Sequence, residues 1–184
     1  ASVYVDNFST INTPPQVSLH SSDGVRITWL SENKVTPEHA LGQYQKQWVK
    51  PSFGTLKTEE GIDLHYQLFK PRVVQGKHPV LVFTYGGPRA QVVRNRWGGN
   101  RGLLMQYFVN KGYVVFGLDN RGSNYRGKAF EDAIYRAMGS VEVDDQVTGV
   151  KYLRSLPFVD PQRIGIYGHS YGGYMVQMAM FKQP

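Results

Sequence analysis

The sequence contains no cysteine. Without thiols the chain cannot form a disulfide scaffold, a thiolate zinc site, an iron–sulfur cluster or a cysteine nucleophile, and its redox compartment stays open. It has no apolar run of the roughly 18 residues that a membrane-spanning helix needs. The first residues, Ala1 to Asp6, lack the basic stretch and apolar core of a secretory signal. What remains is 184 residues, enough for one core of ordinary domain size.

Acidic residues are scarce in the middle of the chain. Between Leu64 and Phe130 eleven Lys or Arg residues accompany a single acid, Asp119, within a formal net charge of +7. The basic residues are spread among glycines and apolar residues, without a dense basic block or an RNA-binding aromatic signature. We therefore expect a solvated or partner-facing basic surface and no nucleic-acid partner.

The first part of the chain has the pattern of short β-strands. Three such segments are predicted at residues 3–5, 16–19 and 25–30, separated by breaks at Pro14-Pro15 and Asp23-Gly24. Three strands with no helix after them cannot close a core by themselves. Residues 1–45 are thus predicted to be the end of a larger all-β unit, and residues 46–184 a second domain.

From Pro51 onward strands alternate with helices. A hairpin of residues 53–57 and 64–68 is predicted around a turn at Glu59-Glu60-Gly61, to which we assign no substrate role. The alternation beyond this hairpin predicts a parallel sheet covered by helices, the α/β class. Its strands and helices are predicted at residues 80–83, 102–110, 113–116, 142–156, 164–167 and 174–181.

Two of these helices carry distinctive residues. In the helix at 142–156, Asp144 and Asp145 are interpreted as charges that favour the helix start. The helix at 174–181 is apolar almost all round, so it is predicted to be buried beneath the sheet, and Tyr174 is predicted to be one of its packed residues.

The residues Gly168-His169-Ser170-Tyr171-Gly172 form a G-x-S-x-G motif between a predicted buried strand and a predicted buried helix. A sharp strand-to-helix turn would hold Ser170 in a strained conformation that exposes its hydroxyl, and larger flanking residues would collide with the backbone. The backbone N–H of Tyr171, at the helix N-terminus, would then stabilise an oxyanion. Side chains adjacent on such a turn diverge, so His169 is not expected to act as the base.

Several further motifs accompany this turn in order along the chain. They are Tyr85-Gly86-Gly87-Pro88, Asp119-Asn120-Arg121-Gly122-Ser123 and Glu142-Val143-Asp144-Asp145-Gln146. With them, the segment from Tyr85 to Met180 resembles the dipeptidyl-peptidase IV branch of the prolyl oligopeptidase family of serine peptidases. The residues Asp6-Asn7-Phe8-Ser9 resemble the closing stretch of that family's β-propeller. The resemblance implies an α/β-hydrolase fold, ending just after the nucleophile helix, preceded by the C-terminal strands of a propeller.

The resemblance also implies roles for individual residues. It makes Ser170 the nucleophile, Tyr171 the backbone donor of the oxyanion hole, and Tyr85 the second donor through its phenolic O–H. The ring of Tyr171 is implied to line the pocket for the penultimate substrate residue. The implied reaction releases dipeptides from substrates with a free N-terminus, with Pro or Ala as the penultimate residue.

The sequence departs from the family after the nucleophile. A hydrolase of this fold places its triad in the order Ser, Asp, His, yet no Asp or His comes after Ser170 in the sequence. We therefore expect an internal fragment of a longer peptidase, which by itself is inactive and aggregates. The resemblance further implies no cofactor or metal, a homo-oligomer of the full-length protein, and a periplasmic or extracellular location.

Three alternatives stay open. Residues 122–129 nearly match a phosphate-binding loop, but Ala129 lacks the hydroxyl that would bind Mg²⁺. The nucleophile turn does not encode the substrate, so an acylaminoacyl-releasing enzyme or another peptidase or esterase of the same fold is the main competing function. A non-catalytic homologue that serves protein interaction is the third alternative, although intact Ser170 and Tyr85 argue against it.

Overall fold

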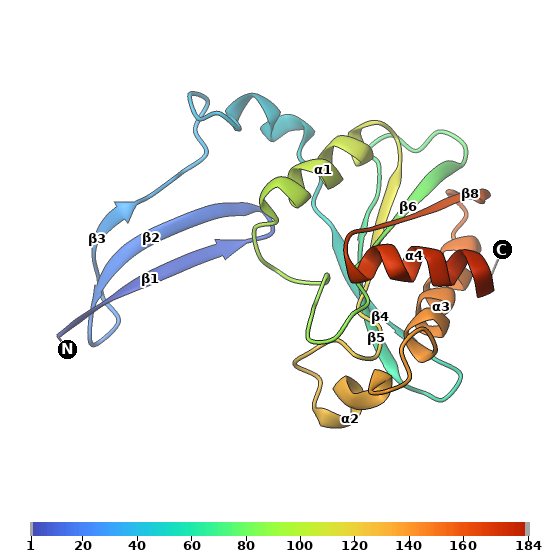
Figure 1. The fold of residues 1–184 in the computed structure, drawn as a ribbon. Helices are drawn as coiled ribbons and strands as arrows, with labels where there is room; N and C mark the ends of the chain where they lie inside the picture. Colours follow the sequence, from blue (N-terminus) through green and yellow to red (C-terminus); the bar gives the residue numbers. More distant parts are fainter. Residues whose placement is uncertain (1, 183–184) are drawn as a thin grey trace. The chain divides into compact units, whose positions relative to one another are not determined.

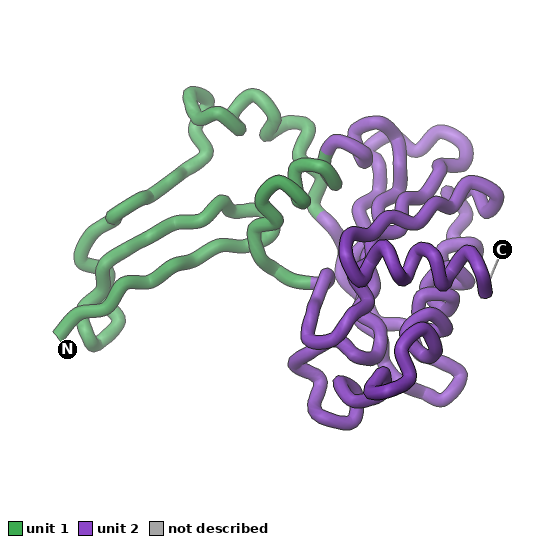
Figure 2. Tube along the Cα trace, viewed as in Figure 1, with its two compact units in different colours: residues 1–50, 94–106 green, residues 51–93, 107–184 purple. Residues whose placement is uncertain are grey.

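A computed structural model describes residues 2–182 of the chain. The polypeptide divides into two compact units, one of residues 1–50 and 94–106 and the other of residues 51–93 and 107–184 (Figure 2). This partition interleaves along the sequence, unlike the predicted domains 1–45 and 46–184, which remain a prediction.

The first unit contains an antiparallel sheet of three strands in the order β1-β2-β3 (Figure 1). Its elements are β1 (Val3–Thr10), β2 (Thr13–Ser21), β3 (Arg26–Ser31) and the 3₁₀ helix η1 (Gly42–Gln47). The predicted strands are all present, and the turn at Asp23-Gly24 is confirmed. Pro14 and Pro15, predicted to break a strand, lie within β2. They are tolerated there because they precede the first residue paired with β3, Val17, and face a register shift in β1.

Residues 94–106 belong to this unit through specific contacts. Trp97 stacks on Trp48 with ring centroids 5.1 Å apart and an angle of 6° between the planes. The Gln106 side chain accepts from the Val49 N–H at 2.9 Å and donates to the Val49 carbonyl at 2.8 Å. A single side-chain amide therefore satisfies both backbone groups of one buried residue.

The second unit is built on a five-stranded sheet in the order β4-β5-β7-β6-β8. Its strands are β4 (Ser52–Lys57), β5 (Asp63–Phe69), β6 (His78–Thr84), β7 (Val114–Leu118) and β8 (Val159–Gly168). The predicted hairpin β4-β5 is confirmed, with Gly61 at positive φ in its turn. Strands β6, β7 and β8 are parallel as predicted, but β5 pairs antiparallel with β7, so the sheet as a whole is mixed.

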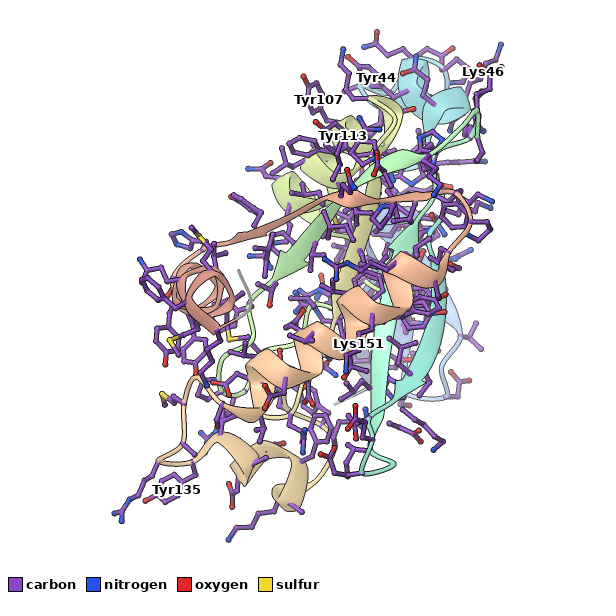
Figure 3. All side chains as sticks on the ribbon, turned by 90° about the vertical axis from the view of Figure 1, so that its right-hand side faces the viewer. Tyr44, Lys46, Tyr107, Tyr113, Tyr135 and Lys151 are labelled. Atoms are coloured by element: carbon purple, nitrogen blue, oxygen red, sulfur yellow. The ribbon has the colours of Figure 1, made fainter. Side chains whose placement is uncertain are left out.

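The helices lie close to the predicted positions. They are α1 (Gly99–Asn110), whose residues fall in both units, α2 (Lys128–Glu131), η2 (Asp132–Ile134), α3 (Val141–Ser155) and α4 (Tyr171–Lys182). Helix α3 crosses one face of the sheet with exposed Lys151 on its outer side (Figure 3). The core beneath it combines Leu153 with the alternating strand residues Val114, Phe116 and Leu118.

Helix α4 differs from its prediction. Met175 and Gly172 are buried, but Met180 is 65% exposed and Phe181 is 81% exposed. The prediction of burial all round is wrong for the described chain because contacts with β8 and α3 cover only one face of the helix. Tyr174 is half-buried and meets the ring of Tyr171 edge-on at 5.2 Å.

Candidate active site

Ser170 lies at the sharp turn between β8 and α4. Its φ angle is +57°, in the left-handed region that a residue with a side chain adopts only at an energetic cost. The side chain is exposed. The backbone therefore holds the Ser170 hydroxyl at the surface, as expected for a nucleophile turn.

Packing requires glycine on both sides of Ser170. A Cβ atom on Gly172 would lie 2.5 Å from the carbonyl oxygen of Thr84, and one on Gly168 would lie 2.4 Å from the carbonyl carbon of Gly172. Real Cβ atoms do not approach backbone this closely, so both positions exclude any side chain. At Gly173, by contrast, the nearest atom would be 3.8 Å away, an ordinary contact.

The first N–H groups of α4 are arranged around the same turn. The N–H of Gly172 donates to His169 O at 2.9 Å, and that of Gly173 donates to Ser170 O at 2.8 Å. Within residues 2–182 no group accepts a hydrogen bond from the N–H of Tyr171, so this N–H is available to donate to a ligand oxygen. Nor does any hydrogen bond in this range join His169 to the Ser170 hydroxyl.

Tyr85 comes to the same place from the neighbouring strand. Strands β6 and β8 run parallel with Thr84 opposite Gly168, so the chain leaves both strands at the same edge of the sheet. The rings of Tyr85 and Tyr171 have centroids 6.3 Å apart. The Tyr85 hydroxyl makes no hydrogen bond within the described part of the chain. The three predicted site residues thus come from adjacent strand ends.

The turn after Tyr85 packs tightly on α4. A Cβ atom on Gly87 would lie 2.6 Å from Cγ of Tyr171, and one on Gly86 would lie 2.6 Å from Cγ of Met175. The two glycines therefore let the backbone of this turn lie directly against the helix that begins after Ser170.

Sequence reasoning missed the role of Glu142. This side chain is fully buried at the start of α3, and its Oε1 accepts a hydrogen bond from the Tyr171 hydroxyl at 2.9 Å. Burial, and secondly the hydrogen bond to Glu142, raise the pKa of Tyr171 well above its ordinary value. The sequence signal was present, since Glu142 belongs to the motif that carried the family resemblance.

Asp145 was interpreted as a helix-start charge, and for this residue the interpretation is wrong. The side chain is buried and binds Arg121 through Nε at 3.1 and 3.0 Å and through Nη2 at 2.7 Å. Hydrogen bonding to Asp145 raises the pKa of the Arg121 guanidinium above its ordinary value. Asp144 is exposed in the first turn of α3, where it fits the interpretation.

Two acidic residues of the hairpin turn also have structural partners. Glu59 pairs with Lys151 at 3.3 Å, and Glu60 lies 3.8 Å from Arg121. That neither glutamate has a substrate role remains a prediction. The near match to a phosphate-binding loop continues only into the four-residue helix α2.

Metal centres and membrane spans are two further classes of site. Residues 2–182 bring together no group of three His, Asp or Glu side chains that could hold a metal ion. No helix in that range has the length and hydropathy needed to cross a bilayer.

In a mixed sheet with parallel strands, a strand whose carboxyl end leads through a strained serine turn into a helix is the defining feature of the α/β-hydrolase class of fold. Residues 101–184 match the prolyl oligopeptidase family. The chain belongs to this family, and its relatives place it in the dipeptidyl-peptidase IV branch.

The similar proteins cover nearly the whole chain. It is 41% identical to dipeptidyl peptidase 8 of Mus musculus over 193 residues, which span 98% of this chain and 21% of that protein. It is 36% identical to prolyl endopeptidase FAP of Homo sapiens over 157 residues, 84% of this chain and 20% of that protein.

Solved structures give the same result. One described as a dipeptidyl aminopeptidase IV from Bacteroides ovatus is 39% identical with a TM-score of 0.86, covering 100% of this chain and 26% of that chain. The structure of dipeptidyl peptidase 4 of Porphyromonas gingivalis is 32% identical with a TM-score of 0.87, and the match covers 98% of this chain and 25% of that chain. The predicted fold class, propeller-type strands ahead of an α/β-hydrolase sheet, is confirmed. The chain spans about a fifth to a quarter of the length of these relatives.

Proposed function

We propose that these residues form part of a serine exopeptidase that releases dipeptides from the N-terminus of peptides. The observation that carries the proposal is the left-handed conformation of exposed Ser170 between two positions that only glycine can occupy. A protein has little reason to maintain this strain unless the hydroxyl is used. Ser170 is the proposed nucleophile.

The proposed oxyanion hole has two donors. The N–H of Tyr171 has no acceptor among residues 2–182, and Tyr85 directly follows the adjacent strand β6, so its hydroxyl is the proposed second donor. A backbone donor and a side-chain donor that point at the same developing charge stabilise a tetrahedral intermediate without reorganising during the reaction. The ring of Tyr171 is proposed to border the pocket for the penultimate residue.

The proposed chemistry proceeds in two steps. A histidine takes the proton of the Ser170 hydroxyl as its oxygen bonds to the carbonyl carbon after the second substrate residue. The C–N bond then breaks, and the histidine returns the proton to the departing amine. In the second step water attacks the acyl-enzyme and releases the dipeptide, and the proton returns to Ser170.

This mechanism needs a triad Asp and His, and the proposal places both in a longer polypeptide that contains these residues. No Asp or His comes after Ser170 in the sequence, and His169 has no hydrogen bond with it in the described range. The chain spans 21% of dipeptidyl peptidase 8, so most of such a protein would lie outside these 184 residues.

The substrate preference is proposed from the relatives. Their names include dipeptidyl peptidases and a prolyl endopeptidase, which support peptides with Pro near the cleaved bond. We propose Pro or Ala at the penultimate position. The second candidate is a peptidase that accepts a blocked N-terminus, because the endopeptidase relative is 36% identical to this chain.

The test compares two substrates on the longer protein that carries these residues. Gly-Pro-anilide has a free N-terminus, and N-acetyl-Gly-Pro-anilide differs only by the blocking group. The proposal predicts release of aniline from the free substrate and little from the blocked one. Equal turnover of both would favour the second candidate. Turnover of neither by correctly folded protein would refute the peptidase function and favour a non-catalytic homologue.

A further inference from the structure

Two buried polar side chains lie one turn apart on the same face of α3. Glu142 is fully buried and Gln146 is 4% exposed, and the four-residue spacing places them side by side. Asp144, between them in the sequence, faces solvent. The proposed chemistry uses neither buried residue directly, although burying such groups is costly unless their hydrogen bonds are satisfied.

The carboxylate of Glu142 connects the start of α3 to Tyr171. It accepts hydrogen bonds from the N–H groups of Gly139 and Ser140 and from the Tyr171 hydroxyl. No cation pairs with it within residues 2–182, so backbone N–H groups at the helix start balance its charge. The Tyr171 hydroxyl is therefore occupied, and the ring is fixed at its tip by Glu142 and at its base by the close approach of Gly87.

Gln146 connects the same helix to the Tyr85 turn through a second residue. Its Nε2 donates to Asn120 Oδ1 at 2.9 Å and to the carbonyl of Leu118 at 3.2 Å. Asn120, 1% exposed, in turn donates from Nδ2 to the carbonyl of Gly86 at 2.9 Å. The Gly86 carbonyl belongs to the peptide group between Gly86 and Gly87, so these linked hydrogen bonds fix the turn that directly follows Tyr85.

We infer that Glu142 and Asn120 are positioning residues for the two donors of the oxyanion hole, with Glu142 fixing Tyr171 and Asn120 fixing the turn of Tyr85. One face of α3 thereby holds both donors, which come from different strands. The inference rests on the proposed function, since it concerns where the two donors lie relative to Ser170. A misplacement of about 1 Å in such groups costs up to about 100-fold in rate.

The test uses mutant cycles in the longer protein, with kcat and KM for Gly-Pro-anilide as readouts. Asn120→Ala is made in the wild type and in Tyr85→Phe, and Glu142→Gln is made in the wild type and in Tyr171→Phe. We expect each single variant to lower kcat by about 10- to 100-fold. In the Phe background the same change should lower kcat less than about twofold. Tyr85→Phe already lacks the hydroxyl that Asn120 positions, and Tyr171→Phe already lacks the hydroxyl through which Glu142 holds the Tyr171 ring.

Three further measurements keep the result interpretable. Asp144→Asn, on the same helix but exposed, serves as the matched control and should leave kcat unchanged. Thermal unfolding of every variant shows whether it folds. If Asn120→Ala does not fold, Gln146→Met removes the donor that orients Asn120 and should show the same dependence on Tyr85.

Two outcomes would contradict the account in different ways. Equal losses of kcat in the wild-type and Phe backgrounds would mean that Glu142 and Asn120 stabilise the fold without positioning the donors, and would overturn the inference alone. A wild-type protein that releases no dipeptide would overturn the proposed function, and the inference with it.

Discussion

The turns after β6 and β8 lie at the same edge of one sheet but are held in place differently. At Ser170 much of the constraint is local: the residue has positive φ, and glycine at 168 is required by the backbone of Gly172, although glycine at 172 is itself required by Thr84 O of the neighbouring strand β6. At Tyr85 the constraint is imposed by residues distant in the sequence. The Gly86 carbonyl accepts a hydrogen bond from Asn120, 34 residues further along the chain, and Gln146 in turn orients Asn120. A strained turn can thus be specified by a short motif, whereas a donor loop depends on the assembled fold.

The largest expected effect comes from removing the nucleophile. In the longer protein, Ser170→Ala should lower kcat for Gly-Pro-anilide by about 10⁴- to 10⁶-fold, because it removes the oxygen that the proposed mechanism uses to attack the carbonyl. Substrate binding and thermal unfolding should change little. Retention of more than a few per cent of activity would assign the nucleophile to another residue.

A smaller but still large effect is expected at the buried ion pair between Asp145 of α3 and Arg121, which follows β7. Asp145→Asn removes the negative charge that pairs with Arg121 and leaves a largely buried guanidinium without its main partner. The free energy of unfolding should fall by about 3 kcal/mol, measured by urea denaturation. The exposed neighbour Asp144→Asn is the control. A loss no larger than that of the control would show that the ion pair contributes little.

Within the nucleophile turn, two adjacent glycines provide a matched comparison. Gly172→Ala forces a methyl group to 2.5 Å from Thr84 O and should destabilise the protein by about 1–3 kcal/mol. Gly173→Ala meets only an ordinary contact inside a helix and should be neutral or stabilising by up to about 1 kcal/mol. Denaturant midpoints measure both. Similar effects of the two substitutions would disprove the steric requirement for glycine at position 172.

The smallest effect is expected away from both turns, at Tyr152. Burial, and secondly a hydrogen bond with Tyr66, raise the pKa of Tyr152 to about 12. The unfolded chain loses this proton near pH 10, so the free energy of unfolding should fall as pH rises from about 10 to 12. In Tyr152→Phe the free energy of unfolding should fall less steeply between about pH 10 and 12, as measured by denaturation at a series of pH values. Identical slopes would show that the pKa is not raised.

The same contrast explains what the sequence could predict. The strand–Ser170–helix turn could be predicted because its motif occupies five consecutive residues, 168–172, and the alternation of strands and helices located nearly every element. The antiparallel pairing of β5 with β7 could not be predicted from the sequence, because it depends on which strands meet in the folded sheet. The roles of Glu142 and Asp145 were hidden for the same reason, since their partners Tyr171 and Arg121 lie 29 and 24 residues away.

Helix α4 shows a different limit of sequence reasoning. Its composition predicts burial all round, but composition records what a helix could bury and not what covers it in the described chain. Pro14 and Pro15 show a third limit. Proline lacks the N–H that a strand pairing uses, but it can lie in a strand wherever that N–H is not needed, and the register of β2 gives these two positions no partner.

The central claim, that the strained turn presents a reactive nucleophile, is tested most directly by covalent labelling. The longer protein is treated with a fluorophosphonate, digested and analysed by mass spectrometry, with Ser170→Ala as the control. We predict one adduct, on the peptide that contains Ser170, formed in parallel with the loss of dipeptide release and absent from the control. Complete loss of dipeptide release with no adduct on Ser170 would contradict the account.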